Sequence, residues 1–194
     1  MLEHLPEAGA SLPTPKAREV FFTKQVTQDT ISELSQKILE INRNDAYLTK
    51  LYALHGVDYI PRPIRLYIDS YGGSVYQCFG LLGIMENSKT PIDTIVIGVA
   101  MSAGFMIAIH GHKRFAYKHA TLMYHQLSSM SWGKMADLEQ DLEESKRLHK
   151  KMLEQTIKHT HITLRTLEDN YERKVDWYMP AEEALANGCI DEII

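Results

Sequence analysis

The chain has little cysteine, no long apolar run and no excess of basic charge. Its two cysteines, Cys78 and Cys189, lack C-x-x-C spacing, which excludes a disulfide framework and indicates a reducing compartment or simple core packing. No apolar stretch reaches the roughly 20 residues that span a bilayer. The first residues, M-L-E-H-L-P-E, lack the basic and apolar regions of a signal peptide. We therefore expect a cytoplasmic protein that does not bind a membrane.

Charge and motifs exclude further classes. The formal net charge of -4 gives no electrostatic argument for a nucleic-acid partner. The phosphate-binding patterns G-x-x-x-x-G-K-[ST] and G-x-G-x-x-G are both missing, so no nucleotide cofactor is predicted. His110 and His112, like His159 and His161, have a spacing that could bind a metal. No clustered acid or cysteine completes either pair, and we predict no metal site.

The regular elements alternate along the 194 residues. Residues 1–17 contain three prolines and predict an irregular, flexible arm. Strands are expected at 19–26, 64–68, 92–97, 114–117, 121–124 and 189–194, and helices at 27–42, 74–87, 103–109, 135–159 and 180–188. Residues 44–63 are harder to place. Alternation of this kind predicts an α/β fold with substantially parallel strands.

Ser102 lies at a predicted turn from a strand to a helix. The preceding run is rich in β-branched residues, and the following run carries no polar side chain. A serine there has its hydroxyl at the positive end of a helix dipole, among unpaired backbone N–H groups. That position suits a hydroxyl that attacks a carbonyl and leaves an oxyanion. Serine is also a favoured N-cap residue, so this segment alone leaves both interpretations open.

Three other segments carry groups that could act with Ser102. Gly72 and Gly73 form a turn between a strand and a helix, where backbone N–H groups can point at an anion or simply make a turn. His125 follows a strand-like run, and Asp176 precedes a short helix. Each could be an ordinary core, surface or capping residue. Together they could also converge as nucleophile, general base and orienting carboxylate.

Five segments, taken in order, resemble the proteolytic subunit of the Clp protease, the ClpP family. F-F-T-K-Q-V resembles that family's first strand, F-L-T-G-Q-V, and L-Y-I-D-S-Y-G-G-S-V resembles L-Y-I-N-S-P-G-G-S-V. G-V-A-M-S-A-G-F resembles the nucleophile turn G-x-A-A-S-M-G, and L-M-Y-H-Q resembles V-M-I-H-Q. D-W-Y-M-P-A-E-E-A resembles D-x-F-M-S-A-E-E-A. The resemblance covers about Val20 to Ile194, with an interruption near 44–63.

The resemblance assigns roles to particular residues. The residues that match the catalytic triad are Ser102 as nucleophile, His125 as general base and Asp176 as the carboxylate that orients it. Gly73 and Ala103 match the donors of the oxyanion hole, and Gly72 shapes the turn beside them.

The resemblance also implies a fold and an assembly. The fold is a ClpP/crotonase-like α/β core of repeated ββα units with a protruding helical handle at about 126–160. Residues 18–194 would then form one serine peptidase domain. Heptameric rings would stack in pairs through their handles and hydrolyse unfolded or short polypeptides. An ATP-dependent AAA+ unfoldase would supply folded substrates, and no cofactor is implied.

The chain departs from the family at five places. Residues 44–63 are longer than the usual connection, and the N-terminal arm does not match the family's axial loop. Gln126-Leu127 replaces Gln-Pro, and Ser129-Met130 replaces Gly-Gly in the handle segment. Val175 replaces an arginine that commonly links ring to ring. Ring stacking and unfoldase docking are the properties that these changes affect.

Three hypotheses follow from the sequence. The first is a ClpP-like serine endopeptidase, which rests on the triad and the glycine turn. The second is a catalytically silent ring subunit that acts as a scaffold or partner. The third is an acyl-CoA enzyme of the crotonase type, which would share the fold and a backbone oxyanion hole. The set of Ser102, His125 and Asp176 argues against the third.

Overall fold

A computed structural model describes residues 13–128 and 133–194 of the chain. Most of the predicted arm, residues 1–12, lies outside this range, and residues 13–18 form neither helix nor strand. The predicted change at Ser129-Met130 also lies outside the described residues. No helix in the described ranges combines the length and the apolar character needed to cross a membrane.

Strands and helices alternate, and the sheet is mainly parallel. The strands are β1 (Glu19–Phe22), β2 (Ile64–Ser70), β3 (Ile92–Met101), β4 (Arg114–Ala116), β5 (Thr121–Tyr124), β6 (Trp177–Pro180) and β7 (Glu192–Ile193). The sheet has the order β1-β2-β3-β4-β7, with β5 paired to β3 and β6 paired to β5. Only the pairing of β5 with β6 is antiparallel within the described residues. The predicted mixed α/β fold with a parallel sheet is confirmed.

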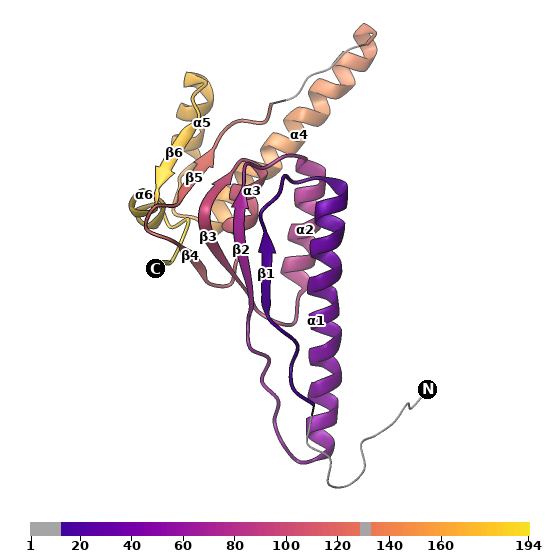
Figure 1. Ribbon diagram of the computed structural model, residues 1–194. Helices are drawn as coiled ribbons and strands as arrows, with labels where there is room; N and C mark the ends of the chain where they lie inside the picture. The colour runs from indigo at the N-terminus through magenta and orange to yellow at the C-terminus, as the bar shows by residue number, and fades with distance from the viewer. Residues whose placement is uncertain (1–12, 129–132) are drawn as a thin grey trace.

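The helices cover the sheet and extend beyond it. They are α1 (Gln28–Leu54), α2 (Val75–Asn87), α3 (Ala103–Ala108), α4 (Met135–His159), α5 (Leu164–Arg173) and α6 (Ala181–Ala186). In Figure 1, α1 and α2 lie side by side next to the sheet, while α4 projects away from it as the expected handle does. Helix α5 and strand β6 follow the C-terminal end of α4 and lead to α6. Strand β6 was not among the expected strands.

Helix α1 continues well past residue 42, where the apolar pattern was expected to end. Its buried face runs from Ile31 through Leu34, Ile38 and Ile41 and then meets Asp45. A carboxylate at a core position breaks the apolar pattern, so the sequence periodicity did not predict a helix beyond this point. In the structure this carboxylate is hydrogen-bonded, and the helix continues to Leu54.

A buried polar network holds Asp45 in place. Arg18 donates from Nη1 and Nη2 to the two carboxylate oxygens at 2.6 and 2.5 Å. Tyr59 and Thr90 donate their hydroxyls to the same group at 2.7 and 2.5 Å. Burial acts to raise the pKa of Asp45, but these hydrogen bonds outweigh it and the pKa is lowered. The network fastens the segment at 44–63 to the start of β1.

Helix α4 lies alongside α2 through the half nearest the sheet. Three side-chain contacts join the two helices: Tyr76 with Glu144, Phe79 with Lys151, and Glu86 with Lys158. Residue numbers rise together in these pairs, so the two helices run in parallel. Their C-terminal ends therefore lie close to one another.

Candidate active site

The sheet register brings the ends of several segments to one place. Met101 at the end of β3 pairs with Met123 of β5, and Tyr124 pairs with Trp177 of the antiparallel β6. The residues just beyond these pairs are Ser102, His125 and Asp176. Pairing between the strands therefore sets these three side chains next to one another, although Asp176 is 51 positions after His125 in the sequence.

Ser102 occupies a sharp turn between β3 and α3. Its φ of 54° and ψ of -120° are unusual for a residue with a side chain. Its backbone N–H donates to the carbonyl of Met123 at 2.9 Å, which fixes the turn against β5. The side chain makes no capping hydrogen bond. The helix-cap interpretation therefore does not describe this serine, and strained backbone of this kind is common at functional turns.

His125 faces the serine. The distance from His125 Nε2 to Ser102 Oγ is 2.7 Å, within hydrogen-bond reach. The other ring nitrogen, Nδ1, lies 3.9 Å from Oδ1 of Asp176. The His125 side chain is 20% exposed and that of Asp176 is 53% exposed. The serine and histidine are thus in direct contact, whereas the carboxylate stands about one ångström beyond hydrogen-bond distance.

Gly72 and Gly73 pack tightly beside the serine turn. Their φ angles are 94° and 143°, in the region that favours glycine. A Cβ on Gly72 would lie 2.6 Å from Met101 O and 2.9 Å from Ala103 N, and one on Gly73 would lie 2.4 Å from Val26 O. A side chain at Gly72 would push the glycine turn away from the serine turn, and one at Gly73 would push it away from Val26.

Two backbone donors border the serine hydroxyl. The N–H of Ala103 opens α3, where helix geometry supplies no acceptor. Within the part of the chain that the structure describes, neither this N–H nor that of Gly73 donates a hydrogen bond. Unpaired N–H groups at such a turn can accept a developing negative charge from a substrate oxygen.

A cavity of about 370 Å³ opens over these groups. Gly73, Ser102 and His125 line it, and α4 contributes Leu148 and Met152 to the lining. These two α4 residues are buried. The cavity is therefore bounded by the base of the handle.

Sequence reasoning missed a polar cluster at the rim of this cavity. Tyr76 donates to Oε1 of Glu144 at 2.6 Å, and Arg147 donates to both carboxylate oxygens at 2.7 Å. The hydrogen bonds from Arg147 and then Tyr76 lower the pKa of Glu144 to about 2. The hydrogen bond to Glu144 in turn raises the pKa of Tyr76. No short-range sequence signal joins Tyr76 to Glu144, because they lie on different helices.

Comparison with known proteins identifies the family. The sequence profile of the Clp protease family matches residues 14–194. The chain belongs to the Clp protease family. It is 28% identical over 181 residues to ATP-dependent Clp protease proteolytic subunit 1 of Prochlorococcus marinus subsp. pastoris, covering 92% of this chain and 84% of that protein. It is 35% identical over 133 residues to the ATP-dependent Clp protease proteolytic subunit of Deinococcus radiodurans, covering 68% of this chain and 64% of that one.

Membership of the Clp protease family agrees with the resemblance drawn from the five sequence segments. Its mixed α/β fold with a parallel sheet is the one observed here. The structure brings together all six residues that the sequence singled out for the site: Gly72, Gly73, Ser102, Ala103, His125 and Asp176.

Proposed function

We propose that this Clp protease family member is a serine endopeptidase, with Ser102 as nucleophile, His125 as general base and Asp176 as the orienting carboxylate. The observation that carries the proposal is the 2.7 Å contact between His125 Nε2 and Ser102 Oγ. A serine hydroxyl is a weak nucleophile at neutral pH, and an adjacent base is the usual means of activating it.

The proposed reaction begins when Ser102 Oγ attacks the carbonyl carbon of a peptide bond. His125 Nε2 takes the hydroxyl proton and later gives it to the leaving amine. Water then repeats the attack on the acyl-enzyme and releases Ser102. Asp176 would hold the proton on His125 Nδ1, which leaves a lone pair on Nε2 toward the serine.

The backbone N–H groups of Gly73 and Ala103 would receive the oxyanion. They flank the serine turn, and the close packing of Gly72 on Ala103 N holds them side by side. Removing one such donor typically lowers the rate by about 10²- to 10³-fold. Replacement of the family's usual methionine by Ala103 leaves this donor intact, because the N–H belongs to the backbone.

The substrates would be unfolded or short polypeptides. The cavity over Ser102 continues along α4 and is bordered by the acidic residues Asp141 and Glu144 as well as by apolar side chains. An extended peptide can lie in such a groove, whereas enclosure within the rings proposed below would keep folded domains from the serine. An AAA+ unfoldase partner would therefore be needed for folded substrates. We also propose a cytoplasmic location for the protein.

We also propose that the chain assembles into heptameric rings that stack in pairs through α4. The outer part of this helix exposes large apolar side chains: Met135 is 72% and Leu142 is 55% exposed. Apolar groups at the free end of a projecting helix favour association with another copy. Val175 is 38% exposed next to Asp176, so ring contacts there would be apolar in place of the family's usual arginine.

A second candidate, a catalytically silent ring subunit, is favoured by one observation. The distance of 3.9 Å from His125 Nδ1 to Asp176 Oδ1 leaves the last triad hydrogen bond unmade. A ring that kept this distance would have the residues of a peptidase without full alignment.

Peptide hydrolysis separates the two candidates. We expect the parent protein to cleave a fluorogenic peptide and Ser102→Ala to lose at least about 10⁴-fold in rate. A fluorophosphonate should label the parent protein at Ser102, and native mass spectrometry of the same sample should report the rings. An assembled ring with no labelling and equal background rates for both proteins would establish the silent subunit.

A further inference from the structure

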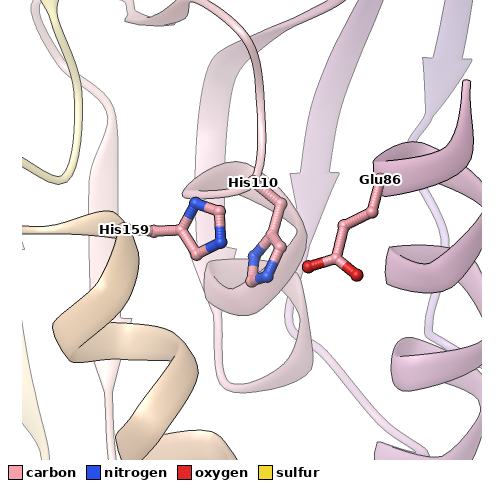
Figure 2. A group of neighbouring side chains, drawn as sticks. All are labelled: Glu86, His110 and His159. Atoms are coloured by element: carbon pink, nitrogen blue, oxygen red, sulfur yellow. The ribbon is translucent and has the colours of Figure 1, made fainter. Parts of the chain in front are cut away.

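Three helices end at one point, about two turns of α4 beyond Met152, which lines the cavity. Glu86 lies in the last turn of α2, His110 follows α3, and His159 is the last residue of α4. Figure 2 shows the His110 ring between the ring of His159 and the carboxylate of Glu86. The centroids of the two imidazoles are 4.0 Å apart. One potential ligand atom from each residue lies within 4.8 Å of the others.

The His110 ring is arranged as a ligand. It is only 6% exposed, and its Nδ1 lies 2.7 Å from the carbonyl oxygen of Met106. A carbonyl can only accept, so Nδ1 carries the proton and the lone pair of the neutral ring is at Nε2. Nε2 faces Oε1 of Gln155 at 3.0 Å.

His159 presents a nitrogen that no protein group satisfies. Its Nε2 is buried and has no hydrogen-bond partner among the described residues. A buried polar atom without a partner is costly, and a metal ion bound to the lone pair would remove that cost.

The surrounding charges permit a cation. The C-terminal ends of α2 and α4 carry partial negative charge, and Glu86 adds a full one. Lys158 Nζ lies 3.3 Å from Glu86 Oε1, but its side chain is 59% exposed and can turn into solvent. The other nearby cation, Arg114, is paired with Asp191 at 2.5 Å. Among the described residues, the positive charge that must move is thus on the exposed side chain of Lys158.

We propose that Glu86, His110 and His159 bind one Zn²⁺ ion, with water or Gln155 as the fourth ligand. Two imidazole nitrogens and a carboxylate suit a borderline divalent metal. Ligand atoms around tetrahedral zinc lie about 3.3 Å apart, given bonds of about 2.0 to 2.1 Å. The observed spread of up to 4.8 Å closes with about 1.5 Å of side-chain movement, and Glu86 is the exposed member that can make it.

The bound ion would fasten the base of the handle to the core. It would join α4 directly to α2 and α3, and α3 begins at the residue after Ser102. The same helix α4 carries Leu148 and Met152, which line the cavity. The ion has a structural role in this proposal and takes no part in the proposed peptidase chemistry.

Metal titration of the full chain tests the site. After treatment with a chelator, the parent protein should bind one Zn²⁺ per chain by calorimetry. A Zn²⁺ concentration about a hundredfold above Kd should raise Tm by about 5 to 10 °C. Co²⁺ should give visible absorption bands typical of four-coordinate nitrogen and oxygen ligands. Ser102→Ala should behave in the same way, so the result is independent of peptidase activity.

Variants locate the ion. His159→Gln should abolish the Zn²⁺ equivalent and the Co²⁺ bands, whereas His119→Gln, at an exposed histidine, should retain both. If His159→Gln does not fold, Glu86→Gln carries the test, because this exposed side chain can be changed without disturbing the core. It should weaken binding by about tenfold or more. Unchanged Zn²⁺ affinity in the folded variants, or no binding by the parent protein, would overturn the proposal.

Discussion

Replacing Ser102 by glycine should yield a more stable protein than replacing it by alanine. Both variants lose the hydroxyl and its 2.7 Å contact with His125, so that loss cancels in the comparison. The backbone at this position has φ 54° and ψ -120°, which glycine adopts freely and alanine does not. The difference between the two variants therefore measures the strain stored in the turn.

The magnitude follows from two opposing contributions. A residue held in a sparsely populated backbone region costs about 1 to 3 kcal/mol. Glycine avoids that cost, but its greater freedom in the unfolded chain lowers the free energy of unfolding by about 0.5 to 1 kcal/mol. The free energy of unfolding of Ser102→Gly should therefore exceed that of Ser102→Ala by about 1 kcal/mol. For a chain of this size the difference corresponds to about 2 to 4 °C in Tm.

Thermal unfolding at one fixed protein concentration provides the assay, with both variants measured side by side. A matched pair at Ser32, an exposed position inside α1, should give the opposite sign. There Ser32→Gly should be less stable than Ser32→Ala by about 1 kcal/mol, because glycine is a poor helix former. If Ser102→Gly proved no more stable than Ser102→Ala, the turn would not be strained.

Two further predictions concern buried polar groups. Asp45→Ala should destabilise the protein by about 3 to 5 kcal/mol, because it leaves Arg18 buried without its partner. The control is Glu40→Ala, which should leave Tm unchanged because the pair of Glu40 with Lys16 is exposed. The pKa of Asp45 is lowered on folding. Its contribution to the free energy of unfolding should therefore be full above the unfolded pKa near 3.8 and should fall as pH drops through the lower folded pKa. Measuring Tm against pH for the parent and Asp45→Ala proteins would detect this loss. Tyr124→Phe should be neutral or stabilising by about 1 kcal/mol, because the buried Tyr124 hydroxyl has no partner in the described residues and burial raises its pKa to about 12; a marked loss of Tm would indicate a partner.

Local patterns were sufficient for most elements of the fold. The helix at 135–159 and the strand at 121–124 have the boundaries that the sequence predicted. The strand expected at 92–97 instead runs to Met101. At its added part, the position of Gly98 leaves room for the Asp69 side chain, whose Oδ1 accepts from Val99 N at 2.9 Å. That contact comes from the neighbouring strand and leaves no periodic signal.

The candidate site was also visible in the sequence, but only as separate segments. Each residue type stood at the edge of a regular element, and resemblance to the Clp protease family joined them. The distances within the site depend on pairing between β3, β5 and β6. Strand β6 was not among the expected elements, so the position of Asp176 relative to His125 could not be anticipated.

The sequence by itself determined the alternation of strands and helices, the glycine turn and the identity of the candidate nucleophile, since these depend on neighbouring residues. Tertiary structure decided what depends on distant ones. It set Ser102 against His125, placed Asp176 at 3.9 Å and extended α1 by pairing Asp45. It also brought His110 and His159, one from each of the two histidine pairs, next to Glu86. Spacing along the chain cannot reveal such a group, because its members meet only where three helices end together.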